Sequence, residues 1–240
     1  PSLAGGDMNE GEMSTRLGLS GIPAAAEAIM LERDMRLVEM TGARYHAAHL
    51  STGEGVEIIR RAKARGLPVT ADTAPPYFAL NELAIGDYRT FAKLSPPLRT
   101  EDDRQAIVEG LKDGTIDAIA SDHAPQPVDG KRQPMSQAEP GGIGLETLLP
   151  VSLELYHNGH FGLIDLLKRL TTGPSDVLGL EAGQMKIGYQ ADLMLFDPNI
   201  GWKIDPVKFH SKSKNSPFDG RPVQGRVLKT FVDGRLVFER

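Results

Sequence analysis

Cysteine is absent from the 240 residues of the chain, and tryptophan occurs once. Without cysteine the chain can form neither a disulfide bond nor a cysteine-ligated zinc site, so a metal ion would have to be bound by His, Asp, Glu or a modified Lys. The absence of cysteine also suits a reducing compartment, and the cytoplasm is the location that we expect.

Long apolar runs and a positive net charge are absent as well. No apolar run approaches the roughly 20 residues of a membrane-spanning helix, and the first residues lack the basic-then-apolar order of a signal peptide. The formal net charge is -5 with a pI of 5.7, and no stripe of basic residues is interleaved with aromatic ones. We therefore expect neither nucleic acid nor a membrane as a partner.

The order of patterns in the first three quarters of the chain is typical of an α/β fold. Strand-like runs at 43–50, 67–72 and 117–120 alternate with helical patterns at 23–42, 51–65 and 100–113. This alternation predicts a parallel sheet with crossover helices. Only three or four such units fit before residue 180, whereas a closed TIM (β/α)8 barrel needs eight. The chain also begins in a glycine-rich loop without Met, so we expect the C-terminal portion of a longer protein.

The pattern changes after Gly188. Strand-like runs at 191–197, 225–232 and 235–238 follow one another, and Asp233-Gly234 is typical of a two-residue hairpin turn. We therefore divide the chain into residues 1–184, part of a TIM barrel, and residues 185–240, a small β-domain expected to be a β-sandwich.

The predicted strand at 117–120 is followed directly by Ser121, Asp122 and His123. In a (β/α) barrel the C-terminal ends of the strands carry the catalytic groups, and a carboxylate there can bind a divalent metal or move a proton. The polar loop 126–142 has a length typical of active-site loops. The simpler alternative is that Asp122 caps the next turn and His123 is a surface residue.

His46 and His49 lie on or just after the predicted strand that ends at Leu50. Residues three apart on a strand face opposite sides, so we expect at most one of the two to face the barrel mouth. His49 is nearer the C-terminal end and is the candidate ligand, because imidazole and carboxylate together suit zinc-like ions. A structural role for a single strand histidine is the alternative.

Other polar or aromatic candidates are interpreted as structural. His157 and His160 flank a helix end, and Trp202 is expected to pack within the β-domain. Lys131 and Arg132 could close over an anionic substrate, but adjacent charges are more often solvated.

Five motifs in order resemble the dihydroorotases of the amidohydrolase superfamily, with the best match to the bacterial class I enzymes, which are related to allantoinases and hydantoinases. The resemblance covers essentially the whole chain. The motifs are Tyr45-His-Ala-Ala-His-Leu-Ser-Thr52, Leu94-Ser-Pro-Pro-Leu-Arg99, Ser121-Asp-His-Ala-Pro125, Gly141-Gly-Ile-Gly-Leu-Glu-Thr147 and Gly188-Tyr-Gln-Ala-Asp-Leu193.

The resemblance implies a TIM barrel with a binuclear zinc site and a composite β-domain. It implies the reversible hydrolysis of L-dihydroorotate to N-carbamoyl-L-aspartate in pyrimidine biosynthesis. By motif, His49 corresponds to a metal ligand and Asp122 to the carboxylate that binds metal and moves the proton. His123 corresponds to the group that binds the substrate carboxylate, and Gly144 and Leu145 correspond to backbone contacts with the ring. A homo-oligomer is expected, with aspartate transcarbamoylase as a candidate partner.

Two departures from the family pattern bear on the metal site. No His-x-His motif occurs, which we attribute to an N-terminal half outside this chain. Tyr77 occupies the place of a histidine that ligates the second metal in relatives, so one ion, or a weakly bound second ion, is expected. A smaller departure is Ser95, where many relatives have Asn.

Two alternatives to a dihydroorotase stay open. The shared motifs also fit another cyclic amidohydrolase, such as an allantoinase or a hydantoinase-like enzyme. The substitution at Tyr77 would also fit a non-catalytic dihydroorotase-like subunit that partners aspartate transcarbamoylase.

Overall fold

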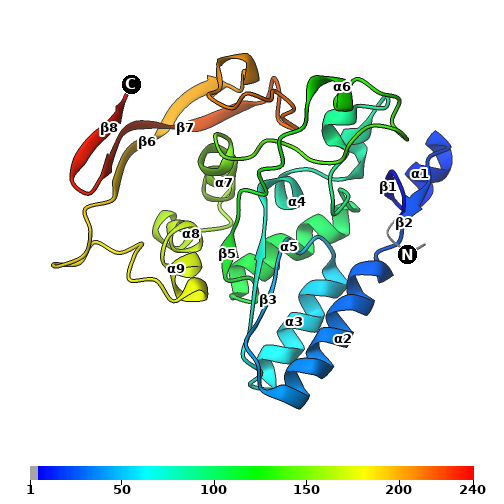
Figure 1. Cartoon of the computed structure of the whole chain (residues 1–240), viewed down its shortest axis with the longest axis horizontal. Coiled ribbons are helices and arrows are strands. Elements are labelled where there is room, and N and C mark those ends of the chain that lie inside the picture. The colour runs from blue at the N-terminus through cyan, green and yellow to red at the C-terminus, as the bar shows by residue number, and fades with distance from the viewer. Residues whose placement is uncertain (1–4) are drawn as a thin grey trace.

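A computed structural model describes residues 5–240 (Figure 1). The helices are α1 (Glu12–Leu17), α2 (Ala25–Thr41), α3 (Gly53–Ala64), α4 (Pro75–Ala79), α5 (Glu101–Asp113), α6 (Val128–Lys131), α7 (Leu148–His157), α8 (Leu163–Leu170) and α9 (Thr172–Leu178), with short 3-10 helices η1 (Glu82–Ile85), η2 (Thr90–Ala92) and η3 (Pro206–Lys208). The strands are β1 (Met8–Asn9), β2 (Gly21–Ile22), β3 (Tyr45–Ala47), β4 (Val69–Thr73), β5 (Ala118–Ile119), β6 (Leu193–Lys203), β7 (Pro222–Val232) and β8 (Arg235–Glu239).

The central sheet has the order β3-β4-β5, and both pairings are parallel. Tyr45 pairs with Val69, and Asp72 pairs with Ala118. The C-terminal ends of the three strands therefore meet at one edge of the sheet, as the alternating pattern predicted. The strands are shorter than the sequence indicated: β3 ends at Ala47, before the predicted end at Leu50.

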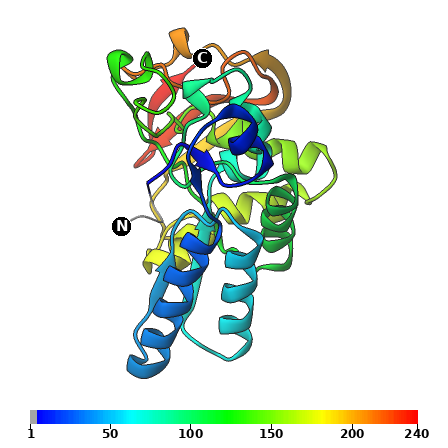
Figure 2. The same cartoon turned by 90° about the vertical axis from the view of Figure 1, so that its right-hand side faces the viewer.

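Helices α2, α3 and α5 run side by side next to this sheet (Figures 1 and 2). Each turns an apolar face inward, and Leu31, Ile59 and Ile107 are among the buried residues of one core cluster. The close approach of α3 and α5 requires a glycine: a Cβ on Gly110 would lie 2.8 Å from Val56 Cγ1. Burial of these faces supplies the main stabilising term for this part of the fold.

Helix α3 begins at Gly53, two residues after the start of the helical pattern at 51–65. Thr52, and not Ser51, is the N-cap, and its side chain accepts the N–H of Gly55. The hydroxyl and the N–H of Ser51 both donate to the carboxylate of Glu27 on α2. The N–H and hydroxyl of Thr52 donate to the same carboxylate. Glu27 thus ties α2 to the start of α3, immediately after His49.

The C-terminal strands form an antiparallel sheet in the order β6-β7-β8. Asp233 and Gly234 have φ angles of 50° and 73°, which are the left-handed values that a tight hairpin turn needs. Trp202 packs within this region as expected: its Nε1 donates to the Gly225 carbonyl, and the Arg226 guanidinium lies over its ring. Within residues 5–240 these strands make one layer, so the second layer of a β-sandwich is not part of the described chain.

The loop 126–142 contains the short helix α6 and is anchored by a buried lysine. We expected Lys131 to be solvated, and this was wrong: it is 2% exposed. Its ammonium donates to the carbonyls of Thr90, Lys93 and Glu139, which compensates the cost of burying the charge. None of the helices within residues 5–240 combines the length and apolar character that crossing a membrane requires.

Replacing Glu27 with Ala removes the acceptor of the bonds from Ser51 and Thr52. We expect the free energy of unfolding to fall by about 2–4 kcal/mol, because buried donors lose their partner. Chemical denaturation measures this change. The control is Glu32→Ala on the same helix, where an exposed ion pair with Arg61 predicts a loss below about 1 kcal/mol. Equal losses in the two variants would contradict the anchoring role of Glu27.

Candidate active site

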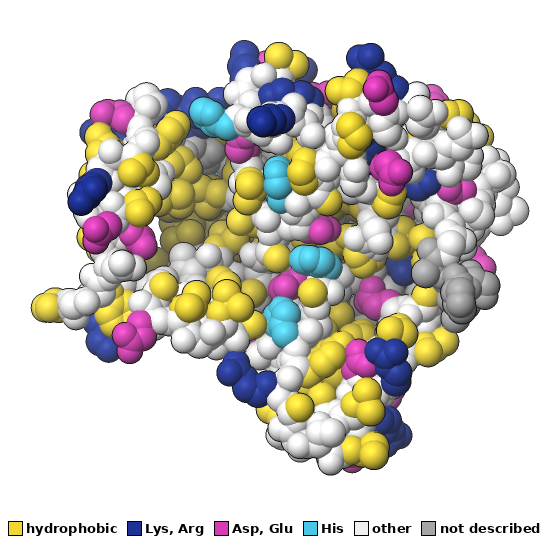
Figure 3. All heavy atoms as spheres, in the orientation of Figure 1, with side chains coloured by type: hydrophobic (Ala, Val, Ile, Leu, Met, Phe, Trp, Pro, Cys, Tyr) yellow, Lys and Arg dark blue, Asp and Glu magenta, His cyan; other side chains and the backbone are white. Residues whose placement is uncertain are grey.

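Three parallel strands bring His49, Asp72 and Asp122 together at the C-terminal edge of the central sheet. His49 follows β3, Asp72 lies near the end of β4, and Asp122 follows β5. Figure 3 shows histidine and acidic side chains gathered along the middle of one face of the molecule. The structure therefore places His49 and Asp122, two of the sequence-predicted residues, 3.7 Å apart, and a second carboxylate, Asp72, lies beside the other nitrogen of the His49 ring.

The backbone of two of these residues is in the left-handed region. His49 has a φ of 59° and Asp122 a φ of 46°. Such conformations cost a residue with a side chain on the order of 1–3 kcal/mol, and they persist where surrounding contacts hold them. For His49 the holding contact is the Asp72 carboxylate, whose Oδ1 accepts the His49 N–H at 2.7 Å.

His46 and His49 converge on Asp72. His46 Nε2 lies 2.9 Å from Asp72 Oδ2, and His46 Nδ1 lies 2.8 Å from Thr70 Oγ1. His49 Nδ1 lies 3.0 Å from Asp72 Oδ1, but off the line of a hydrogen bond. The expectation that the two histidines face opposite sides was wrong, because β3 has ended before His49 and the left-handed turn reverses the direction of its side chain.

The charges in this cluster shift the pKa values of the residues that form it. The Asp72 carboxylate next to the His49 ring raises the pKa of His49 above its ordinary value of 6.5, against the opposing effect of burial. Burial alone would raise the pKa of Asp72, but the His49 and His46 groups around it hold the pKa below its ordinary value of 3.8. Both shifts favour the charged pair over the neutral one.

Asp122 contacts His49 on one side and Tyr77 on the other. Asp122 Oδ1 lies 3.7 Å from His49 Nε2. The Tyr77 hydroxyl lies 3.1 Å from Asp122 Oδ2 and 3.1 Å from the Pro96 carbonyl, so its proton is shared between two acceptors. Tyr77 is 3% exposed, and burial, followed by the charge of Asp122, raises its pKa well above 10.0. The phenol is thus a neutral donor to the predicted catalytic carboxylate.

His123, Gly144 and Leu145 form a second contact group beside Asp122. The Gly144 and Leu145 N–H groups point to His123 Nδ1, at 3.1 and 3.5 Å. A neutral His123 ring therefore carries its proton on Nε2, which leaves one N–H free to donate to an anion. Only glycine fits at position 144, because a Cβ would lie 1.9 Å from the Ser121 carbonyl oxygen. Asp122 and Gly144 line the same small cavity.

The described residues supply part of a metal site. His49 and Asp122 are donors of the types that zinc takes, and His49 Nε2 faces Asp122 Oδ1 at 3.7 Å. Across residues 5–240, however, no group of three or more His, Asp or Glu side chains is arranged to hold a metal ion. These residues do not complete a coordination shell by themselves.

Sequence reasoning missed Asp72. The rule that selected Asp122, a carboxylate at the C-terminal end of a predicted strand, also applies to Asp72, which ends the run 67–72. Sequence reasoning also missed Asn215, because no local pattern indicates that its side chain reaches the loops of the site.

The sequence pattern of the amidohydrolase family matches residues 11–237. This range contains each of the site residues described above. The chain therefore belongs to the amidohydrolase family.

Curated relatives of the chain carry the name dihydroorotase. The dihydroorotase of Anaplasma phagocytophilum is 51% identical over 98% of this chain and 53% of its own length. That of Syntrophotalea carbinolica is 50% identical over 99% of this chain and 56% of its own length. The predicted resemblance to bacterial dihydroorotases is confirmed, and the chain spans about half the length of the curated relatives it matches.

Solved hydantoinase structures share the fold of the described residues. The L-hydantoinase (dihydropyrimidinase) from Arthrobacter aurescens superposes with a TM-score of 0.88 at 31% identity, covering 92% of this chain and 50% of that protein. The dihydropyrimidinase from Brevibacillus agri gives a TM-score of 0.86 at 25% identity, covering 91% and 50%. The expected amidohydrolase fold of the TIM-barrel type is confirmed over about half of its length.

Replacing Asp72 with Asn removes the charge that stabilises protonated His49. We expect the pKa of His49 in the metal-free protein to fall, because the lowering effect of burial is then opposed only by the charge of Asp122. Titration by NMR measures this change, with His157, which contacts the Pro198 carbonyl, as the internal reference. An unchanged His49 pKa in the variant would show that the Asp72 carboxylate does not raise it.

The same pair makes a pH-dependent contribution to stability. The raised pKa of His49 contributes stability that is fully present below pH 6.5 and is lost as the pH rises through the folded-state pKa. The lowered pKa of Asp72 contributes stability that is fully present above pH 3.8 and is lost as the pH falls through the folded-state pKa. The stability difference between the native protein and Asp72→Asn is therefore expected to be largest between these values and to shrink on either side, as chemical denaturation over a pH series would show.

Proposed function

We propose that the protein is a dihydroorotase, which hydrolyses L-dihydroorotate to N-carbamoyl-L-aspartate and catalyses the reverse ring closure in pyrimidine biosynthesis. The observation that carries the proposal is the 51% identity with a named dihydroorotase across 98% of the chain. The geometry agrees with a cyclic amide substrate that bears a carboxylate, because a carboxylate able to move a proton and a group of N–H donors share one rim.

In this proposal Asp122 is the proton-transferring carboxylate. It lies between the Tyr77 hydroxyl and the His49 ring, where its position is restricted on both sides. His123 binds the substrate carboxylate through its Nε2–H, because its Nδ1 is occupied by backbone donors. The backbone groups of Gly144 and Leu145 contact the dihydropyrimidine ring, which would require the substrate to compete with His123 for their N–H groups.

Zinc is the cofactor that we propose, with His49 and Asp122 as the ligands that this chain supplies. A bound zinc ion would activate water and polarise the substrate carbonyl. The remaining ligands would come from outside the described residues. Tyr77 already donates to Asp122 Oδ2, which supports one ion, or a second ion bound weakly.

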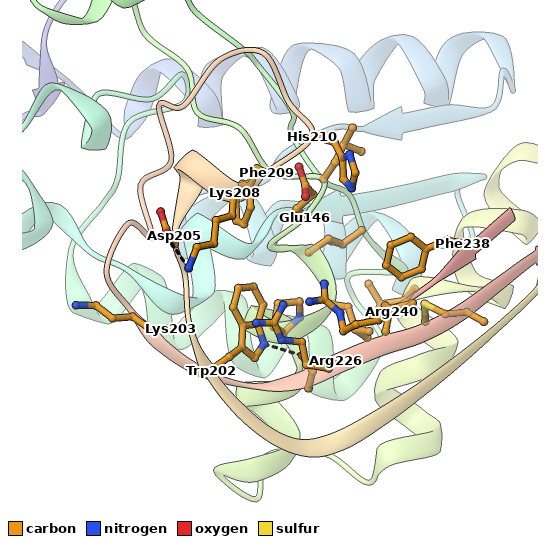
Figure 4. Close-up of a pocket in the computed structure, with 18 of the residues that line it drawn as sticks. Glu146, Trp202, Lys203, Asp205, Lys208, Phe209, His210, Arg226, Phe238 and Arg240 are labelled. Carbon is orange, nitrogen blue, oxygen red and sulfur yellow. Dashed lines mark hydrogen bonds and ion pairs between the residues drawn. The ribbon is translucent and has the colours of Figure 1, made fainter.

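We also propose that the β6-β7-β8 sheet is one layer of a composite β-sandwich, within a β-domain at 185–240. Exposed apolar side chains on the sheet support this, including Leu195 and Val237. A cavity of about 540 Å³ lies between α7, α8 and the sheet, and Trp202 and Phe238 contribute to its wall (Figure 4). Additional strands would cover this apolar surface.

Two alternatives keep support. The 31% identity with an L-hydantoinase favours a different cyclic amide as the next candidate substrate. Tyr77 beside Asp122 favours a non-catalytic subunit that partners aspartate transcarbamoylase. Homo-oligomerisation and a cytoplasmic location stay predictions.

The test is the opening of L-dihydroorotate by the protein, with zinc supplied and then removed by a chelator. Zinc-dependent turnover is the expected result. Allantoin and hydantoin are assayed in parallel, and turnover of either one alone would transfer the proposal to that substrate class. Folded, zinc-loaded protein that opens none of the three rings would favour the non-catalytic subunit.

Asp122→Asn tests the role of the carboxylate. Asparagine tolerates the left-handed backbone, so the variant removes the proton acceptor with little added strain. We expect kcat to fall by about 100-fold or more, the size of a lost general acid–base step. Asp129→Asn, at an exposed position on α6, is the charge-matched control and should keep full activity. If Asp122→Asn retains more than about 3% of the native activity, Asp122 is not the proton-transferring carboxylate.

A further inference from the structure

Asn215 lies in the segment 211–218, between η3 and β7, far from the central sheet in the sequence. It is 3% exposed and begins a run of four buried residues that ends at Phe218. Nothing in the reaction proposed above uses this side chain. A buried amide needs partners for its donors and its acceptor, so its contacts identify what it holds.

All side-chain hydrogen bonds of Asn215 go to the two loops of the candidate site. Its Nδ2 donates to the Gly141 carbonyl at 3.0 Å and to the Ala124 carbonyl at 3.4 Å. Its Oδ1 accepts the Gln126 N–H at 3.3 Å. Its own carbonyl accepts the Ile143 N–H at 3.1 Å. The contacts therefore alternate between the loop after β5 and the loop before α7.

These two loops carry the residues that are predicted to contact the substrate. The first loop continues from Asp122 and His123, and the second contains Gly144 and Leu145. Their relative position decides whether the N–H groups of the second loop reach the His123 ring. The loops also pair directly, because the Ala124 N–H donates to the Gly142 carbonyl. Asn215 adds the contacts on both sides of that pairing.

The neighbours of Asn215 enclose the same place. Pro217 and Phe218 line the small cavity that Asp122 and Gly144 also line. Gly142 fits against Pro217 so closely that a Cβ would lie 2.9 Å from the Pro217 ring. The segment that leads to β7 is thus a wall of the candidate site as well as a connection to the C-terminal sheet.

We infer that Asn215 is a positioning residue, which fixes the two loops so that the Gly144 and Leu145 N–H groups hold His123 Nδ1 and the Nε2–H of His123 faces the substrate. The part of this inference that concerns activity rests on the proposed function. The geometric part does not, because the contact between His123 and the two N–H groups exists without substrate.

The first variant is Asn215→Asp. It keeps nearly the same shape and the acceptor for Gln126, but it loses both donors and places a carboxylate beside two carbonyls. Asn199→Asp is the matched control, because Asn199 is exposed in the C-terminal sheet and its side chain makes no hydrogen bond within the described residues. Asn215→Ser, which is neutral and smaller, serves if the charged variant does not fold.

The first readout is the 15N NMR spectrum of the His123 ring in substrate-free protein. We expect an unprotonated Nδ1 in the native protein and in Asn199→Asp, and a mixture of tautomers in both Asn215 variants. The second readout is kinetic: KM should rise by about tenfold, the effect of one or two misaligned hydrogen bonds, while kcat changes less. A loss of general stability alone would lower the amount of active protein without changing KM or the tautomer.

The inference is overturned if Asn215→Asp or Asn215→Ser folds with the His123 spectrum and the KM of the control. If the native protein opens no cyclic amide, the proposed function fails while the NMR readout still decides the positioning role. A changed tautomer with unchanged KM would also overturn the assignment, because the loops would then not control substrate binding.

Discussion

The Asp72 carboxylate is the group on which the arrangement of the candidate site depends. One oxygen accepts the His49 N–H and the other contacts the His46 ring. Because His49 has a left-handed backbone, its position needs support from outside its own strand, and Asp72 on the neighbouring strand gives that support. The parallel pairing of β3 with β4 brings the two residues together, so strand register, side-chain charge and backbone conformation depend on one another here.

Polar groups around Asp122 come from three separate parts of the chain. Tyr77 approaches from α4, His49 from the end of β3, and the loops that follow Asp122 are held by Asn215 from the C-terminal segment. Each of these groups restricts a different part of the site: the carboxylate, the imidazole, or the backbone N–H groups near His123. The geometry is therefore a property of the whole folded chain, and a family motif of five residues describes only its centre.

Local sequence patterns predicted a large part of this arrangement. Strand-end reasoning selected Asp122 and His49, because parallel strands place their C-terminal ends at one edge. The same patterns failed where a distant group decides the outcome. Glu27 on α2 accepts hydrogen bonds from both Ser51 and Thr52 at the start of α3, and Lys131 is buried because the carbonyls of Thr90, Lys93 and Glu139 surround it. The convergence of both histidines on one carboxylate also required the turn after β3, which no short-range pattern specifies.

The strand order β3-β4-β5 has a mechanical consequence for the site. In the described part of the chain, β3 and β5 each pair with β4 and not with each other. The 3.7 Å separation between His49 and Asp122 therefore depends on how both outer strands pair with β4. Sliding either outer strand by one residue would displace its end by about 3.3 Å, nearly the separation itself. The hydrogen bonds that β4 makes with β3 and β5 thus set the distance between His49 and Asp122.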